Sequence, residues 1–334
     1  MKLPDERGWE PYCRIVETLM SYLGELLKPL HIATVTRDIY RGALKFLLVL
    51  QHDYPEFVSA NHSKLCANIP SHAIQLHNLI LTAYPGQAKV PDPLQPGLKV
   101  DRIDEIRDSP ENSNDFEAPL HESGLFDVLD QALQSGPSED AVAHIAHEIQ
   151  RKKGHGTNSG FVAVSVDVKL IESLVVYVGM HAISRAAQKG GPTYVQASPD
   201  AALLSMLVHE VRPEARYHLI NSVVNQLRFP NAHTHYFSQA LFDLFGSDLN
   251  DQEESDIRQQ IIRILLERLI SHWPQPWGLI IAIMELIRNE KFMFFELPFI
   301  KSSPEVNSFL HNYKRVLTVA KVADRFAALL QMPR

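Results

Sequence analysis

Sixteen histidines are the residues of this sequence that could most readily do chemistry, as metal ligands or as general bases. His144 and His147 are three residues apart, with Glu148 beside them, so a helix would place both on one face. A zincin site needs histidines four residues apart, with the glutamate next to the first of them. This spacing fails that pattern and no third ligand is indicated nearby, so we expect a solvated helix edge and no bound metal.

A second pair of histidines, His233 and His235, flanks Thr234. Two residues of an α-helix are separated by about 200° around its axis, so this pair cannot share a metal from one helix face. We expect these histidines to cap and pack at the start of a helix. The rings of Tyr236 and Phe237 should then point into the core or into a groove.

The remaining motifs that resemble catalytic ones also depart from the required patterns. The glycine-rich loop 154–160 lacks the Gly-Lys-Ser/Thr ending of a phosphate-binding loop, and Asn158 stands where a nucleophile elbow needs serine. The acidic run 251–256 fits the N-terminal turn of a helix. We therefore expect a protein that is not an enzyme, that needs no cofactor and whose loop 154–160 is a flexible connector.

The net charge of −7 and the pI of about 6.1 do not favour binding to a phosphate backbone. The longest basic run, Arg151-Lys152-Lys153, falls at an expected helix C-terminus, where cations are stabilised. Direct RNA binding and membrane binding are not expected. Two alternatives stay open: a helical RNA-binding module, which needs a basic stripe on one face, and a metal hydrolase, which needs histidines converging from separate helices.

The two cysteines, Cys13 and Cys66, each lie in an apolar helical stretch. Two cysteines form neither a disulfide framework nor a cysteine-ligated zinc site, and they suit a reducing compartment. The first eleven residues lack the apolar core of a signal peptide, and no run of about 18 uninterrupted apolar residues occurs. The sequence therefore predicts an intracellular, soluble protein.

Apolar residues recur mainly at helical spacing, and 334 residues exceed the size at which one compact core stops growing. The breaks between the expected helices are mostly short, which favours antiparallel pairs. We predict an all-α fold, a HEAT-like helical array (α-solenoid) forming one elongated domain over 1–334, with a single irregular bundle as the alternative. The expected helices span 36–50, 74–81, 125–133, 142–149, 168–183, 213–227, 235–245, 255–272, 277–288, 304–313 and 314–330, and a further helix should start at Pro199 after the capping residue Ser198.

Three segments carry further expectations. The helix at 36–50 is apolar nearly all round toward its end and should be central. The proline-rich segment 85–120 should be extended or partly disordered, pinned over 90–106 and mobile over 108–117, where Phe116 is the only large apolar residue. Aromatic rings at the break 273–277 and around Pro298 should either plug the array or form a groove for a partner, and Trp277 should be structural.

Ordered blocks over most of the chain resemble the C-terminal region of the large scaffold subunit of the Ccr-Not messenger-RNA deadenylase complex. The N-terminal blocks are Lys45-Phe46-Leu47-Leu48-Val49-Leu50, His52-Asp53-Tyr54-Pro55-Glu56-Phe57, Ile69-Pro70, Ile74-Gln75-Leu76, Asn78-Leu79-Ile80-Leu81, Pro91-Asp92-Pro93 and Leu98-Lys99-Val100-Asp101. The later blocks are Leu174-Val175-Val176-Tyr177-Val178-Gly179, Asn225-Gln226-Leu227-Arg228, Pro230-Asn231, His233-Thr234-His235-Tyr236-Phe237-Ser238, Ile264-Leu265-Leu266-Glu267-Arg268-Leu269-Ile270 and Pro276-Trp277-Gly278-Leu279. Segment 108–160 and the tail after Tyr313 match poorly, and Gln275 and Phe229 replace an expected histidine and tyrosine.

The resemblance implies a helical scaffold that docks a heterodimer of the smaller Not-box subunits, the second with the third or fifth. It further implies a role in messenger-RNA deadenylation, decay and translational repression, in the cytoplasm, P-bodies and nucleus, with the rest of the complex held by other parts of a longer scaffold. Aromatic and arginine side chains usually carry most of the binding energy of an interface. The expected partner-binding residues are Tyr54, Phe57, Arg228, His233, His235 and Tyr236.

Overall fold

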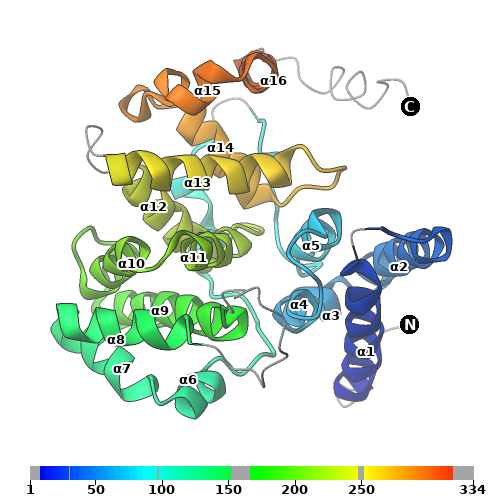
Figure 1. Cartoon of the computed structure of the whole chain (residues 1–334), viewed down its shortest axis with the longest axis horizontal. Coiled ribbons are helices and arrows are strands. Elements are labelled where there is room, and N and C mark those ends of the chain that lie inside the picture. Colours follow the sequence, from blue (N-terminus) through cyan, green and yellow to red (C-terminus); the bar gives the residue numbers. More distant parts are fainter. Residues whose placement is uncertain (1–7, 30, 96–97, 152–165, 247–251, 319–334) are drawn as a thin grey trace.

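A computed structural model describes residues 8–29, 31–95, 98–151, 166–246 and 252–318 (Figure 1). Every regular element within these ranges is helical, so the predicted all-α class is confirmed there. The glycine-rich loop 154–160 and the part of the last expected helix beyond 318 lie outside the described residues.

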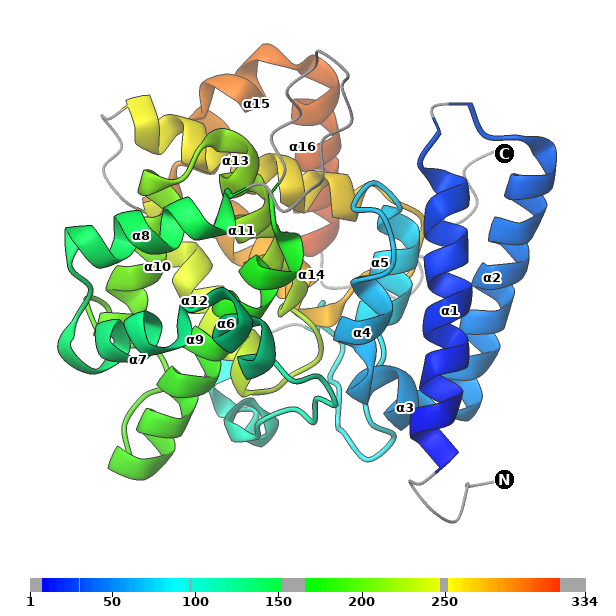
Figure 2. The same cartoon turned by 60° about the horizontal axis from the view of Figure 1, so that its bottom comes forward.

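The N-terminal unit comprises residues 8–83. Helices α1 (Trp9–Leu27) and α2 (Thr34–Asp53) pack side by side (Figure 2), and the shorter helices α3 (Pro55–Ala60), α4 (His62–Cys66) and α5 (Ile74–Leu81) pack against them. Pro55 starts α3, because proline fits the first helical turn, where no amide donor is needed. The buried apolar side chains of this unit form one cluster, from Cys13 to Ala83.

The C-terminal body holds the second large cluster of buried apolar side chains, from Leu120 to Leu310. Its helices stack in order (Figure 1): α6–α8 contact α9 and α10, α9 contacts α11 and α12, and α13 and α14 follow before α16. This arrangement agrees with the predicted helical array. The elements are α6 (Glu117–Ser123), α7 (Phe126–Ser135), α8 (Glu139–Ile149), α9 (Val168–Lys189), α10 (Pro199–Glu210), α11 (Pro213–Asn225), α12 (Ala232–Gly246), α13 (Gln252–Leu269), α14 (Trp277–Arg288), η4 (Glu290–Phe292), η5 (Phe294–Glu296), α15 (Pro298–Ser302) and α16 (Pro304–Thr318).

Helix α9 is the central helix of the body. Among the described residues it is the one helix long and apolar enough to cross a bilayer by composition, but 61% of its apolar window is buried inside the fold. Such burial is what the core helix of a stacked array requires. Gly179, in the middle of α9, allows the ring of Phe237 on α12 to lie directly against the helix backbone.

Two helix-interior glycines allow a matched stability test. A Cβ on Gly179 would lie 2.5 Å from Cζ of Phe237, whereas a Cβ on Gly42 of α2 would meet nothing within 4 Å. We expect Gly179→Ala to cost about 1 to 3 kcal/mol through overpacking. Gly42→Ala should instead stabilise the protein by about 0.5 to 1 kcal/mol, because alanine is the better helix former. Urea unfolding of both variants measures the difference, and equal effects would contradict this packing.

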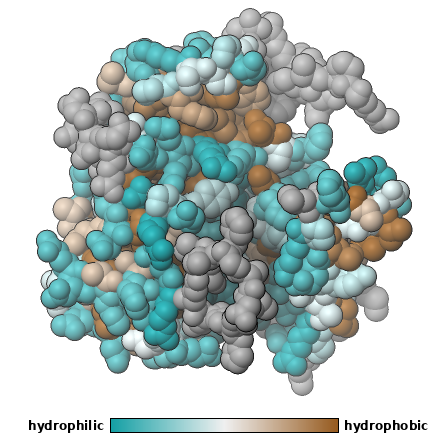
Figure 3. Space-filling view, viewed as in Figure 1, coloured by the Kyte–Doolittle hydropathy of each residue, from teal (hydrophilic) through white to brown (hydrophobic). Residues whose placement is uncertain are grey.

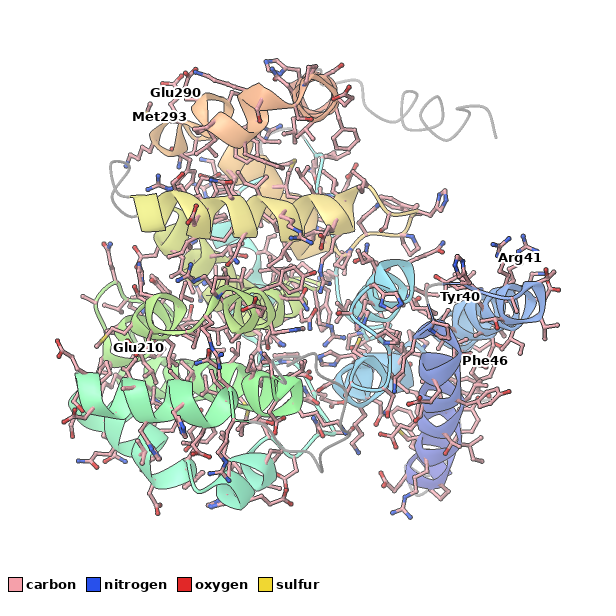
Figure 4. The ribbon with its side chains drawn as sticks, in the orientation of Figure 1. Tyr40, Arg41, Phe46, Glu210, Glu290 and Met293 are labelled. Carbon is pink, nitrogen blue, oxygen red and sulfur yellow. The ribbon has the colours of Figure 1, made fainter. Side chains whose placement is uncertain are left out.

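Helix α2 is the outermost helix, so the prediction that it is central is wrong. Of its twenty residues only Thr36, Ala43, Leu47 and Leu50 are buried. These buried residues lie at helical spacing, partly buried apolar side chains of the same helix pack beside them, and part of its apolar surface faces outward. Hydrophobic side chains gather over this helix at the right of Figure 3, whereas Tyr40 and Phe46, labelled in Figure 4, are partly buried against the N-terminal cluster. The exposed ones are Val35, Leu48 and Val49.

Residues 84–95 and 98–116, here called the strap, cross from the N-terminal unit to the body and include η2 (Val100–Arg102) and η3 (Asp104–Arg107). Segment 108–117, which the sequence predicts to be mobile, is hydrogen-bonded to the rest of the fold at two points. The amide of Ala232 donates to the carbonyl of Asp108 over 2.8 Å, and the amide of Ser113 donates to the carbonyl of Ala60 over 2.9 Å. Phe116 is also buried. These anchors come from helices distant in sequence, so the local composition could not reveal them.

The phenylalanines near Pro298 plug the end of the body. Phe292 and Phe294 both contact the ring of Phe245 at the end of α12, with centroids 5.6 and 6.2 Å away. Both are buried. Met293 between them is exposed and has a positive φ of 45° (Figure 4), so it turns the chain and lets both neighbours face inward. The plug alternative therefore holds for this cluster.

Candidate docking site

Arg228 follows α11 and joins the N-terminal unit to the body. Its side chain is only 2% exposed and reaches across the junction between the two clusters. Its Nη2 donates to the carbonyl and the hydroxyl of Ser59 and to the carbonyl of Ala83, each over 3.1 Å. The guanidinium also lies over the ring of Phe229, 5.2 Å from its centroid.

The oxygen atoms that accept hydrogen bonds from Arg228 lie at helix ends. Ser59 lies in the last turn of α3, and Ala83 follows the end of α5. Helix C-termini carry partial negative charge from unpaired carbonyls, so two of them together can hold a cation. Burial lowers the pKa of Arg228 to about 9, which leaves the side chain charged at neutral pH.

Two buried histidines lie close to this guanidinium. Nδ1 of His62 is 2.9 Å from the carbonyl of Ser59, and its Nε2 is 3.4 Å from Nη1 of Arg228. Nδ1 therefore carries the proton and Nε2 accepts. Burial and the neighbouring Arg228 lower the pKa of His62 well below its usual value, and they lower that of His233 to about 4. Both rings are thus neutral structural groups.

Four of the six expected partner-binding residues are buried. Phe57, Arg228, His233 and Tyr236 are each no more than 6% exposed. Tyr236 donates to Asp200, itself buried and paired with Arg185, so the ring belongs to the interior of the body. These four side chains are not available for direct contact with a partner in this conformation, because each already fills a core or junction position.

The two other expected residues, Tyr54 and His235, reach the surface. Tyr54 is half-buried at the corner between α2 and α3. The side chain of His235 is 19% exposed; its Nδ1 lies 2.8 Å from the hydroxyl of Thr193 and its Nε2 3.8 Å from Asp101. These two residues stay candidates for partner contact, and they lie on different parts of the molecule.

His235 lines a large hollow under the strap, with a volume of about 910 Å³. Residues of α12 and α14 form its floor, and η2 and η3 form one wall. Asp243 on that floor accepts hydrogen bonds from Tyr194 and Gln196, both over 2.7 Å. Its charged residues are mixed in sign, namely Lys99, Asp101, Arg102, Asp243, Glu285 and Lys291. Such a lining favours neither an anion nor a cation.

A second hollow, here called the aromatic groove, has a volume of about 500 Å³ and runs between α2, the end of α5 and the turn before α14. Tyr84 and Phe229 lie with their ring centroids 6.5 Å apart, and Trp273 stands at the other side. The sequence predicts that the aromatic rings of the break 273–277 either plug the array or form a groove. In the structure the two tryptophans of this break differ. Trp277 is buried, whereas Trp273 is 53% exposed.

Trp277 starts α14 and holds the strap, as a structural residue should. Its indole Nε1 donates to the carbonyl of Pro91 over 2.9 Å. We expect Trp277→Phe, which keeps most of the packing, to cost about 1 kcal/mol for the lost hydrogen bond. Amide exchange over 88–95 should become faster in the same variant. Unchanged stability and unchanged protection of these amides would show that this bond does not hold the strap.

The described residues contain no group of three or more histidine, cysteine, aspartate and glutamate side chains that could hold a metal. His144 and His147 both lie on the exposed side of α8. His147 pairs with Glu148.

Comparison with known proteins gives one consistent family. The family model described as "CCR4-Not complex component, Not1" matches residues 1–314. The chain is 33% identical over 305 residues to the CCR4-NOT transcription complex subunit let-711 of Caenorhabditis elegans, which covers 90% of this chain and 11% of that protein. It is 34% identical over 292 residues to the general negative regulator of transcription subunit 1 of Schizosaccharomyces pombe, covering 87% of this chain and 13% of that protein.

Solved structures agree with the sequence comparison. The NOT1 superfamily homology domain from Chaetomium thermophilum matches with a TM-score of 0.87 and 46% identity, over 94% of this chain and 61% of that one. A Not1 C-terminal domain solved in complex with Not4 matches with a TM-score of 0.80 and 31% identity, over 93% and 60% of the two chains. These curated relatives of Caenorhabditis elegans and Schizosaccharomyces pombe are much longer proteins, of which this chain spans 11% and 13%. This chain belongs to the Not1 family of CCR4-Not complex components.

Proposed function

We propose that this chain is a non-catalytic scaffold region that docks a heterodimer of the smaller Not-box subunits within the CCR4-Not complex. One observation carries the proposal: a structure with this fold, at a TM-score of 0.80 and 31% identity, is a Not1 C-terminal domain in complex with another Not protein. The stacked helices support it, because such arrays offer large continuous surfaces. The heterodimer is expected to bury about 2,000 Å² or more.

In this role the chain links the complex to messenger-RNA deadenylation, decay and translational repression. The remaining subunits are held by other parts of the longer scaffold, since the curated relatives extend far beyond the matched region. Its place of action is the cytoplasm, including P-bodies, and the nucleus. Purified protein should not shorten poly(A), and metal-dependent shortening free of contaminating nuclease would overturn the non-catalytic assignment.

The docking proposal is tested by calorimetry with the purified heterodimer of the second and the third or fifth subunits. Tyr54→Ala and His235→Ala, each with an unchanged circular dichroism spectrum, should weaken binding if these residues meet the partner. His144→Ala on the exposed side of α8 is the matched control. Absence of binding by the parent chain would refute the function. Equal binding by parent, Tyr54→Ala and His235→Ala would refute only the two contact residues.

A further inference from the structure

The aromatic groove is the one hollow among those described here that combines an apolar lining with rings open to solvent. Trp273 is 53% exposed, Tyr84 41% and Leu48 49%, while Phe229 behind them is buried. Large exposed apolar side chains that form one surface commonly mark a binding site. Three separate parts of the fold supply them: α2, the start of the strap and the turn between α13 and α14.

The strap shows what kind of segment can pack beside the aromatic groove. Residues 88–92 of the strap lie outside any helix, and Pro91 accepts the indole hydrogen bond of Trp277. Leu94 then packs against Ile280 and Met284 of α14. Val90 and Pro93 of this same stretch line the aromatic groove, so the groove directly continues the interface between strap and α14.

The contacts between the strap and α14 are of the kind by which proteins recognise proline-rich segments: an indole N–H donates to the carbonyl of a proline in extended chain. A polyproline II segment makes no internal hydrogen bonds, so its carbonyls stay free for donors such as an indole N–H. Aromatic-lined grooves bind such segments because flat rings pack against proline rings and the segment is already extended. The polar side chains that line the groove are Gln51, His52, Thr82 and Gln275, and His52 is paired with Asp53. The lining favours an uncharged segment.

We propose that the aromatic groove binds an extended, uncharged, proline-containing segment of a partner protein, beside the strap. This inference rests on the proposed scaffold function, since it names the chemistry of one segment that the scaffold receives. Tyr84 and Trp273 form the two sides that clasp the segment, and Leu48 closes the end next to α2. The buried ring of Phe229, held by Arg228, forms the floor.

The first experiment titrates the chain with a short synthetic peptide that alternates proline with valine and leucine. The comparison peptide has glycine in place of every proline. The indole N–H resonances of Trp9, Trp273 and Trp277 serve as reporters, because Trp273 and Trp277 line the groove whereas Trp9 packs against Phe57 and does not line it. The proline peptide should shift the Trp273 signal and leave Trp9 unchanged. Equal shifts with both peptides, or no shift at all, would overturn the proposal.

The second experiment uses variants that should keep the fold, because both side chains are exposed. Trp273→Ala and Tyr84→Ala should each weaken the proline peptide about tenfold, as expected for aromatic residues that dominate an interface. Ile15→Ala, at a 66% exposed position of α1, is the matched control and should bind as the parent does. Full binding by both groove variants would overturn the assignment.

The same variants separate this inference from the proposed function. If the parent binds the Not-box heterodimer and Trp273→Ala weakens that binding about tenfold, the segment comes from the heterodimer. If the heterodimer binds, and if neither groove variant weakens the binding of the heterodimer or of the proline peptide, the groove proposal fails while the scaffold function stands. If the heterodimer does not bind, the scaffold function fails and the peptide titration alone decides the groove. Self-association of the parent that Trp273→Ala abolishes would assign the groove to a second copy and overturn the proposal.

Discussion

Arg228→Ala is expected to destabilise the protein by about 3 to 5 kcal/mol, the loss typical of truncating a large buried side chain. The substitution removes three hydrogen bonds across the junction and leaves the carbonyl of Ala83 without its guanidinium partner. It also opens a cavity under Phe229. Because the two apolar clusters are separate, the N-terminal unit should loosen before the body unfolds.

Urea unfolding with circular dichroism measures the loss, and amide exchange locates it. Protection should fall first in α3 to α5, while α9 and α11 stay protected. Arg263→Ala is the matched control, because the side chain of Arg263 is 67% exposed and its ion pair with Glu267 is a surface i,i+4 pair. Such pairs contribute about 0.3 to 0.5 kcal/mol. A loss no larger for Arg228→Ala than for this control would refute the junction role.

The helices were the part of the fold that the sequence predicts best. Proline at the first helical position marked the starts of α10 and α11, and the break before Trp277 marked the start of α14. These signals are local, so they can be read without the tertiary structure. The start of α12 was placed too late: it begins at Ala232, which puts both His233 and His235 inside its first turn.

The place of each helix in the array could not be read in the same way. Helix α2 is apolar nearly all round, a pattern typical of a central helix, yet Leu48 and Val49 face outward. Whether such a face is covered depends on which elements pack there, and that is a property of the whole fold. The anchors of the strap could not be predicted for the same reason, because Ala60 and Ala232 belong to helices that are distant in the sequence.

At the candidate site, too, the sequence could not predict which single residues are buried and which are exposed. Arg228 and Trp273 are both large side chains at helix breaks, and their types alone would suit an interface. In the structure Arg228 is buried because two helix C-termini converge on it, and Trp273 is exposed in the turn after α13. The aromatic break 273–277 was the signal for the groove. Tyr84 and Leu48, which complete it, carried no such signal.

Acid should weaken this fold well before pH 4. Burial lowers the pKa of His77 and of His233 to about 4, and the neighbouring Arg268 and Arg228 respectively add to the effect. Burial and Arg228 also lower the pKa of His62 well below the usual value of 6.5. Between pH 6.5 and 4 the unfolded chain therefore binds protons that the native chain does not. The free energy of unfolding falls as the pH falls through this window.

Glu172 acts in the opposite direction. Burial raises the pKa of Glu172 to about 7, and a 2.6 Å hydrogen bond from Ser63 opposes this shift in part. Between pH 7 and about 4.5 the native chain therefore binds a proton at Glu172 that the unfolded chain does not bind. The side chain is only partly covered, so it offsets less than one histidine does. Each separated proton changes the free energy of unfolding by about 1.36 kcal/mol per pH unit. Because three histidines act against one glutamate, the free energy of unfolding should fall on balance between pH 6.5 and 4.

The loss should begin at the junction, because protonating His62 places a second cation 3.4 Å from Arg228. Urea unfolding at several pH values gives the slope, and His62→Gln should reduce that slope by about one proton. His52→Gln, the same change at a side chain that is 87% exposed, is the control for the substitution itself. Amide protection factors at pH 5 should fall first over 55–83. A His62→Gln slope equal to the parent's, or early exchange in α6 to α8 instead, would place the acid-sensitive site elsewhere.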